Sequence, residues 1–156
     1  LWFAEEIFPL IRKEIPHMQF FVVGSKVTEE IKALEQPGNG IVIKGFVSDE
    51  ELEAIYQQCR IVVVPLRYGA GVKGKVVEAI YNGAPIVTTS VGAEGIPEAE
   101  KTLEIADGAE EFARKTVELY QNPKRLKELS DSTQEYIRAN FSVDGAWDVV
   151  KEDFTR

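Results

Sequence analysis

The stretch Pro65-Leu-Arg-Tyr-Gly-Ala-Gly-Val-Lys-Gly-Lys-Val-Val-Glu-Ala-Ile-Tyr-Asn-Gly83 decides how the chain folds. A β-branched run at 61–64 leads into it and is typical of a buried parallel strand. A loop with glycines follows, and then apolar residues spaced as one face of a helix that ends at Asn82-Gly83. A second apolar run, at 85–89, comes directly after. The stretch therefore predicts a strand, a glycine loop, a helix and a second strand.

The residues at the start of this helix suit an anion. Unpaired amides and the positive end of the helix dipole hold phosphate without a dedicated side chain. Glycines at 69, 71 and 74 allow close approach of the backbone, and Lys73 and Lys75 add full charges. Glu78 lies one turn further along and can face the same crevice. Composition alone leaves an ordinary βα turn with solvated lysines as an equal alternative.

Strand and helix patterns alternate along the rest of the chain. Strands are expected at 18–23, 41–43, 61–64, 85–89 and 102–106, and helices at 1–15, 28–34, 48–59, 74–81, 109–120, 123–140 and 142–154. Ser48 and Glu51 form a capping box, and Asp107 is expected to cap the helix at 109–120. The pattern predicts an α/β fold with a Rossmann-like parallel sheet, helices on both faces and ligands at the carboxyl ends of the strands.

Composition limits the function classes. The chain has 156 residues, 44% hydrophobic and 28% charged, which suffices for one compact core. A net charge of −8 argues against nonspecific binding to nucleic acid. Cys59 is the only cysteine, so a reducing, cytoplasmic location is expected, and no apolar run or leader pattern suggests a membrane or secretory segment. The scattered carboxylates at 98–111 are interpreted as a solvated face, not a metal site.

Four ordered motifs carry a family resemblance. They are the stretch at 71–89, Phe20-Phe-Val-Val-Gly24, Ile43-Lys-Gly-Phe-Val-Ser48 and Val91-Gly-Ala-Glu-Gly-Ile-Pro97. Together they resemble the nucleotide-sugar half of GT-B glycosyltransferases of the family-4, glycogen-synthase-like group, over roughly residues 1 to 141. The family usually carries two glutamates eight positions apart. The second matches Glu78, whereas the first would fall at Ala70, which puts recognition of the donor sugar in doubt.

The resemblance implies a set of site residues. Lys73 and Lys75 are expected to hold phosphate and Glu78 to accept hydrogen bonds from ribose hydroxyls. The donor's base is expected against Gly45, Phe46 and Val47, although a plain turn there is the alternative. The remaining expected donor-binding residues are Arg67, Gly69, Ala70, Gly71, Val72 and Glu94, of which Arg67 has a solvated surface position as its alternative.

The implied function is transfer of a sugar. Residues 1–156 are interpreted as a single donor-nucleotide-binding domain, truncated at its N-terminus and lacking the acceptor-binding domain. The whole enzyme is expected to be a retaining glycosyltransferase that moves sugar from a nucleotide-sugar to a glycan, lipid or other acceptor, in polysaccharide biosynthesis, with no cofactor and no essential metal. The piece alone is expected to be inactive, and peripheral membrane contact would come through the missing domain. A non-catalytic nucleotide-binding or regulatory module, or a GT-B sugar-nucleotide epimerase, stays open.

The resemblance also implies a strand before residue 1, placed between the strands at 18–23 and 61–64. Without it, two rows of backbone groups would lack partners. We expect these two strands to close up and pair directly, or a homodimer to form through exposed Trp2 and Phe3.

Overall fold

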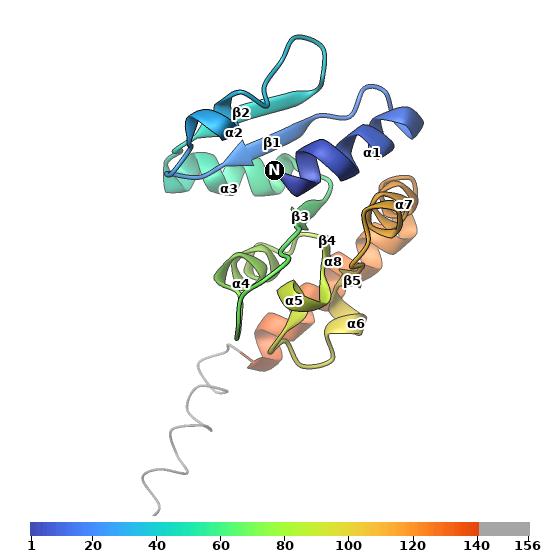
Figure 1. The fold of residues 1–156 in the computed structure, drawn as a ribbon. Coiled ribbons are helices and arrows are strands. Elements are labelled where there is room, and N and C mark those ends of the chain that lie inside the picture. The colour runs from blue at the N-terminus through green and yellow to red at the C-terminus, as the bar shows by residue number, and fades with distance from the viewer. Residues whose placement is uncertain (141–156) are drawn as a thin grey trace, which may run out of the picture.

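The computed structural model describes residues 1–140 and contains parallel strands alternating with helices (Figure 1). The strands are β1 (Phe20–Val23), β2 (Ile41–Gly45), β3 (Val62–Val64), β4 (Ile86–Thr88) and β5 (Glu104–Ile105). The helices are a π-helical segment, η1 (Phe3–Ile7), and then α1 (Phe8–Glu14), α2 (Glu29–Lys32), α3 (Asp49–Gln58), α4 (Gly74–Tyr81), α5 (Ser90–Ala93), α6 (Ala99–Thr102), α7 (Ala109–Tyr120) and α8 (Pro123–Asn140). The predicted alternation is confirmed, but α5 and α6 lie at 90–102, where no helix was expected. The helix expected at 142–154 lies outside the described residues.

The strands form two sheets, and every pairing is parallel. β1 pairs with β2, with Val22 opposite Ile43, and β3, β4 and β5 pair in that order, with Val63 opposite Val87. Each pairing joins strands separated by a crossover that contains a helix, as parallel pairing requires. The carboxyl ends of the strands within each sheet therefore lie at one edge.

The two sheets do not join, which corrects the expected direct pairing of the first and third strands. Within residues 1–140, β1 and β3 are each an edge strand and do not belong to the same sheet. An aromatic cluster spans the junction instead. The ring centroid of Phe3 lies 4.6 Å from that of Phe20 on β1 and 5.8 Å from that of Phe112 on α7. Packing of η1 and α1 across both units thus takes the place of sheet hydrogen bonds.

The same packing corrects the expected dimer surface. Phe3 is buried, with 5% of its surface exposed, and Trp2 is half-buried with its ring edge against Phe112. The expected exposure of Phe3 is therefore wrong, whereas the homodimer itself stays a prediction.

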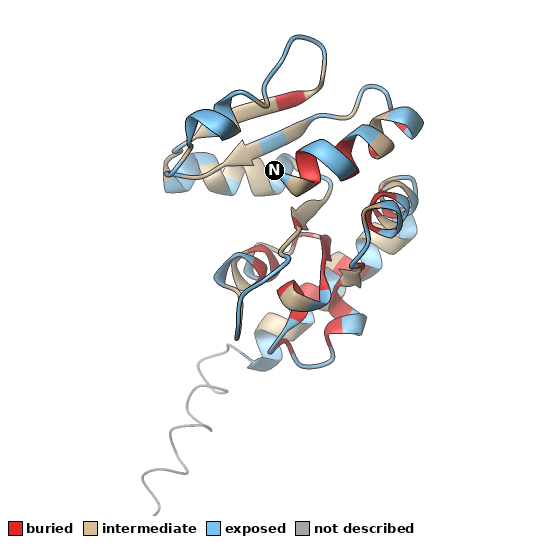
Figure 2. Cartoon of the chain, viewed as in Figure 1, coloured by how far each residue is buried: buried red, intermediate tan, exposed pale blue. Residues whose placement is uncertain are grey.

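Both faces of the three-stranded sheet are covered (Figure 2). Val63 and Val87 contribute to a cluster with α1 and α7. Their neighbours Val62, Val64 and Ile86 contribute to a second cluster with α4, α5 and α6. Because successive side chains of a strand point to opposite faces, this division shows helices on both sides of the sheet, as predicted.

The first helical segment runs without a break from a π-helix, η1, into an α-helix, α1. The amide of Phe8 donates to the carbonyl of Phe3, five residues back, and α1 then begins with Pro9 in its first turn. Proline lacks an N–H and its ring clashes with the carbonyl four residues earlier in a regular helix. The wider π turn accommodates Pro9 where an unbroken α-helix at 1–15 would not.

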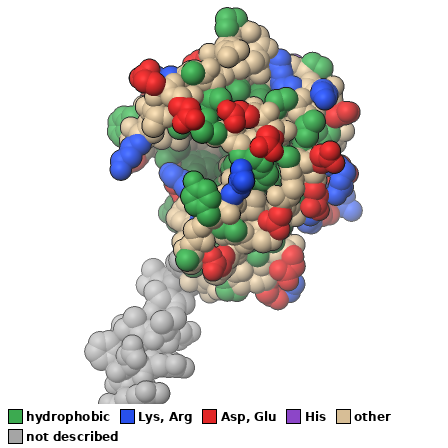
Figure 3. All heavy atoms as spheres, viewed as in Figure 1, with side chains coloured by type: hydrophobic (Ala, Val, Ile, Leu, Met, Phe, Trp, Pro, Cys, Tyr) green, Lys and Arg blue, Asp and Glu red, His purple; other side chains and the backbone are tan. Residues whose placement is uncertain are grey.

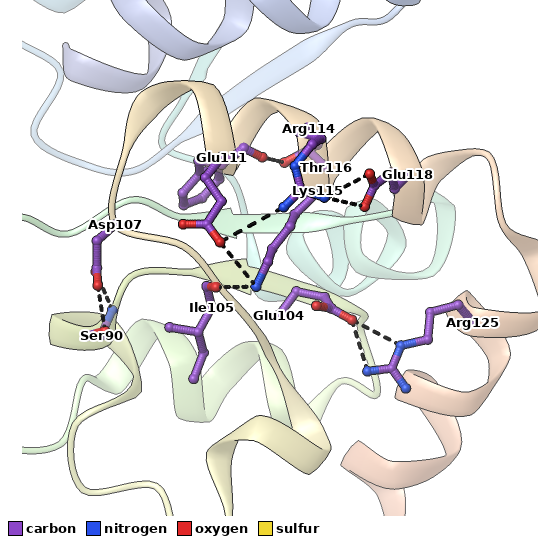
Figure 4. A network of polar contacts seen from close by, with 11 residues as sticks. Ser90, Glu104, Ile105, Asp107, Glu111, Arg114, Lys115, Thr116, Glu118 and Arg125 are labelled. Atoms are coloured by element: carbon purple, nitrogen blue, oxygen red, sulfur yellow. Dashed lines mark hydrogen bonds and ion pairs between the residues drawn. The ribbon is translucent and has the colours of Figure 1, made fainter.

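The C-terminal helices are tied to β5 and its loop (Figure 4). Arg125 on α8 forms a bidentate contact with Glu104, with Nε and Nη2 at 3.0 and 2.9 Å from Oε1. Lys115 on α7 donates to the carbonyl of Ile105 at 2.6 Å. Asp107 does not cap α7, which corrects that prediction. Its carboxylate accepts from the amide and the hydroxyl of Ser90, at 2.8 and 2.7 Å, because the β4 and β5 loops emerge side by side.

Candidate functional site

The glycine loop leaves β3 and enters α4 at the carboxyl edge of the sheet. Gly69 and Gly71 have φ of 126° and 73°, backbone angles that side chains with a Cβ rarely adopt. Lys73 is the N-cap residue of α4, and its side chain does not cap the helix. By contrast, Ser48 caps α3 and Thr89 caps α5. The first amides of α4 are therefore left for another acceptor.

Lys73 is folded back beneath the loop. Its Nζ donates to the carbonyl of Gly71 and lies 3.2 Å from Oε2 of Glu94, in the segment after β4. Only 11% of the Lys73 side chain is exposed. The structure thus brings Lys73 and Glu94 together, although they are 21 positions apart.

Lys75 and Glu78 also meet, on the first turns of α4. Lys75 Nζ lies 2.9 Å from Glu78 Oε2, and the Glu78 side chain is less exposed than that of Lys75. Burial raises the pKa of Tyr56, on α3, to about 12, and the Glu78 carboxylate contributes to the rise. Glu78 on α4 therefore lies near enough to Tyr56 on α3 for its charge to act on the phenol.

Arg67 lies in the same loop and is exposed. Its guanidinium carbon lies 5.6 Å from the ring centroid of Trp2. No carboxylate within residues 1–140 comes within ion-pair distance of it, in contrast to Lys73 and Lys75. Arg67 thus lies against an aromatic ring and has no carboxylate partner within residues 1–140.

β2, in the two-stranded sheet, ends at Gly45 and is followed by Phe46 and Val47. The amide of Gly24 donates to the carbonyl of Gly45 at 2.9 Å, and Phe46 is 79% exposed. A hollow rimmed by hydrophobic and basic side chains separates the part with β1, β2 and α3 from the part with α4 and α5 (Figure 3). The predicted base-binding turn follows β2 and the glycine loop follows β3, so the two belong to different sheets.

Comparison with known protein families assigns the chain to one of them. A family profile described as "Glycosyl transferases group 1" matches residues 1–122, most of the chain. The chain belongs to this family. A curated relative from Klebsiella pneumoniae, an "uncharacterized 44.6 kDa protein in cps region", is 31% identical over 147 residues. The match covers 90% of this chain and 38% of the relative, so the chain spans well under half of the relative's length.

A solved structure agrees with the fold of this group 1 glycosyltransferase chain. The C-terminal domain of a glycosyl transferase group 1 family protein (LpcC) from Francisella tularensis superposes with a TM-score of 0.71 at 19% identity. The match covers 91% of this chain and 80% of that one. The Rossmann-like architecture is thus shared with a group 1 C-terminal domain. No helix within residues 1–140 is long and apolar enough to cross a membrane.

Sequence reasoning missed the residues that fix the loops of this glycosyltransferase domain. The Thr89 hydroxyl donates to the carbonyl of Leu66 and accepts from the amide of Gly92 at 3.1 Å. A Cβ on Gly95 would lie 2.6 Å from the Cγ2 atom of Val72, so the loops after β3 and β4 touch there. A threonine before a helix is a recognisable N-cap signal in the sequence. The hydrogen bond from Thr89 to Leu66, 23 positions away, has no such sequence signal.

Two open hollows lie away from this edge. One of about 450 Å³ is lined by the starts of β3 and β4 and by α8, including Arg60, Pro85 and Lys127. Another of about 420 Å³ lies beside α1 and the start of β2. Neither contains the predicted site residues.

Proposed function

We propose that this chain is the donor-nucleotide-binding domain of a retaining glycosyltransferase. The donor is a nucleotide-sugar, and the acceptor is a glycan, lipid or other molecule bound by a further domain. The relative from a cps region supports a role in polysaccharide biosynthesis. The proposal includes a cytoplasmic location and no essential metal or cofactor.

One observation carries the proposal: the uncapped start of α4 beneath a glycine loop that also carries cations. Free amides at a helix start bind phosphate, and the positive φ angles of Gly69 and Gly71 let that backbone curve toward a ligand. Arg67, which has no carboxylate partner within residues 1–140, supplies a guanidinium at the same edge. The ends of parallel strands in an α/β sheet are the usual position for a nucleotide.

The proposed chemistry is electrostatic. Transfer breaks the bond between the sugar and the nucleoside diphosphate, and negative charge grows on the leaving phosphate. The amides of Gly71 and Val72, with Lys73, Lys75 and Arg67, would stabilise that charge. Glu78 would accept hydrogen bonds from ribose, and Gly45, Phe46 and Val47 would contact the base. Gly69, Ala70 and Glu94 complete the proposed donor site.

Titration with UDP, GDP and ADP, followed by amide NMR shifts, tests the proposal. We expect the shifts to concentrate at 45–47 and at 69–78. Weak binding is expected because further contacts to the donor are proposed to come from another domain. Shifts confined to other residues, or none at millimolar nucleotide, would show that the site is wrong.

A further inference from the structure

The ion pair between Lys73 and Glu94 has a consequence for ligand binding. We propose that Glu94 occupies the place of a phosphate group on Lys73 in the ligand-free protein, and that a bound diphosphate displaces it. Glu94 then belongs to the donor site as the group that the diphosphate replaces on Lys73. This inference rests on the proposed function, since it concerns the same loop.

The burial of Lys73 makes an anionic partner necessary. With 11% of its side chain exposed, the ammonium has little access to water, and an unpaired charge there would be costly. Two of its three N–H donors are already used, by the carbonyl of Gly71 and by Glu94. Because Glu94 is the exposed partner and most of the Lys73 side chain is buried, a phosphate oxygen that approaches from solvent competes with Glu94 for this ammonium. The carbonyl of Gly71 is part of the loop backbone, so Glu94 is the partner that leaves.

Glu94 is suited to leaving. Its side chain is 51% exposed, and it follows the end of α5, next to Gly95. The released carboxylate can therefore be solvated without rearrangement of a helix. A diphosphate carries more negative charge than a carboxylate and attracts the same cation more strongly. Exchange of partners keeps Lys73 neutralised in both states.

The contact between Val72 and Gly95 keeps the exchange local. The Cγ2 atom of Val72 lies against the backbone of Gly95, at a distance that leaves no room for a Cβ. This packing holds the loops side by side whether or not the ion pair is formed. Lys73 can thus change partners without the loop separating from its neighbour.

The decisive variant is Glu94→Gln, which keeps the shape and removes the charge. Calorimetry with inorganic pyrophosphate should give affinity roughly two- to fivefold tighter than wild type, the range expected from losing one competing ion pair. Glu98→Gln is the matched control, because it also removes a carboxylate paired with a lysine, Lys101, outside the loop. We expect Glu98→Gln to change the affinity much less.

A Lys73→Gln variant distinguishes competition by Glu94 for Lys73 from long-range repulsion between Glu94 and the ligand. When Lys73→Gln is already present, adding Glu94→Gln should give no more improvement than Glu98→Gln gives. A gain of the same size as in the wild-type background would mean that Glu94 acts by long-range charge and would overturn the exchange.

An independent measurement uses the unaltered protein. The NMR signal of the Glu94 carboxylate carbon should move toward that of a solvated glutamate as pyrophosphate saturates the loop. A stationary signal, or equal or weaker binding by Glu94→Gln, overturns the exchange but leaves the proposed function in place. Absence of pyrophosphate and nucleotide binding at 69–78 in wild type and variant alike overturns both.

Discussion

The ammonium of Lys75 lies 2.9 Å from the carboxylate of Glu78, one turn further along α4. The sequence assigns these residues to different parts of one ligand, phosphate for the lysine and ribose for the glutamate. Their mutual contact means that changing either residue also changes the charge available to the other. Variants at the two positions should consequently differ in the ligands they affect.

Glu78→Gln should weaken nucleoside diphosphates more than their 2′,3′-dideoxy analogues. Loss of a charged acceptor for ribose hydroxyls costs about 1.5–3 kcal/mol. Pyrophosphate, which has no ribose, should bind no more weakly than before, because Lys75 loses its carboxylate partner. Lys75→Ala should instead weaken diphosphates more than nucleosides. Calorimetric titration measures all four ligands, and equal losses for nucleoside and diphosphate in Lys75→Ala would contradict a phosphate role.

Gly92→Ala should destabilise the fold although alanine favours helices. A Cβ at this position would lie 1.9 Å from Oγ1 of Thr88, whose buried hydroxyl donates to the carbonyl of Val64 at 2.8 Å. Displacing that hydroxyl combines overpacking with a lost buried hydrogen bond, about 3 kcal/mol in total.

Urea denaturation of Gly92→Ala measures this loss. Gly24→Ala is the control, since its Cβ would meet no atom within 4 Å. The double variant Thr88→Ala, Gly92→Ala should lose less stability than the two single changes summed, because the clash is gone. Simple additivity would show that the contact is not the cause.

Stability should fall between about pH 10 and pH 12 in a way that depends on Tyr56. Burial first, and the Glu78 carboxylate second, raise the pKa of Tyr56 from 10.0 to about 12. The folded state then holds a proton that the unfolded state has lost, so this contribution is complete below pH 10 and disappears as pH rises to about 12. Thermal melting across this range should show a smaller alkaline loss for Tyr56→Phe than for wild type.

The comparison for Tyr56 is Tyr68→Phe. Tyr68 is 87% exposed, so its removal should leave the alkaline loss unchanged. An identical loss in Tyr56→Phe and wild type would assign the pH dependence to other groups.

Arg125→Ala should lower the free energy of unfolding by about 1 kcal/mol, a value at the upper end for a partly exposed ion pair; here two guanidinium N–H groups share one carboxylate oxygen. Arg125 joins α8 to Glu104 on β5, and 22% of the Glu104 side chain is exposed. Arg114 makes a bidentate contact with Glu118, but both lie on the surface of α7 (Figure 4). Arg114→Ala should therefore give no measurable change in urea denaturation. Equal effects of Arg125→Ala and Arg114→Ala would mean that an ion pair between α8 and β5 stabilises the fold no more than one within α7.

The sequence by itself determined the elements whose cause is local. The capping box of Ser48 and Glu51 and the start of α8 after Asn122 are formed by hydrogen bonds across three residues, so their pattern is visible in the chain. The alternation of apolar strands with helices likewise predicted parallel pairing and the edge at which the glycine loop lies.

Only the tertiary structure decided how distant segments meet. It placed β1 and β3 in different sheets. It also paired Lys73 with Glu94 and Asp107 with Ser90, which are at least 17 positions apart in the chain. No periodicity or cap signal encodes such contacts, because they depend on how the aromatic cluster around Phe3 holds the two sheets and how neighbouring loops emerge together. The sequence could therefore name the charged groups of the candidate site, while packing determined which of them are paired and which, like Arg67, have no carboxylate partner within residues 1–140.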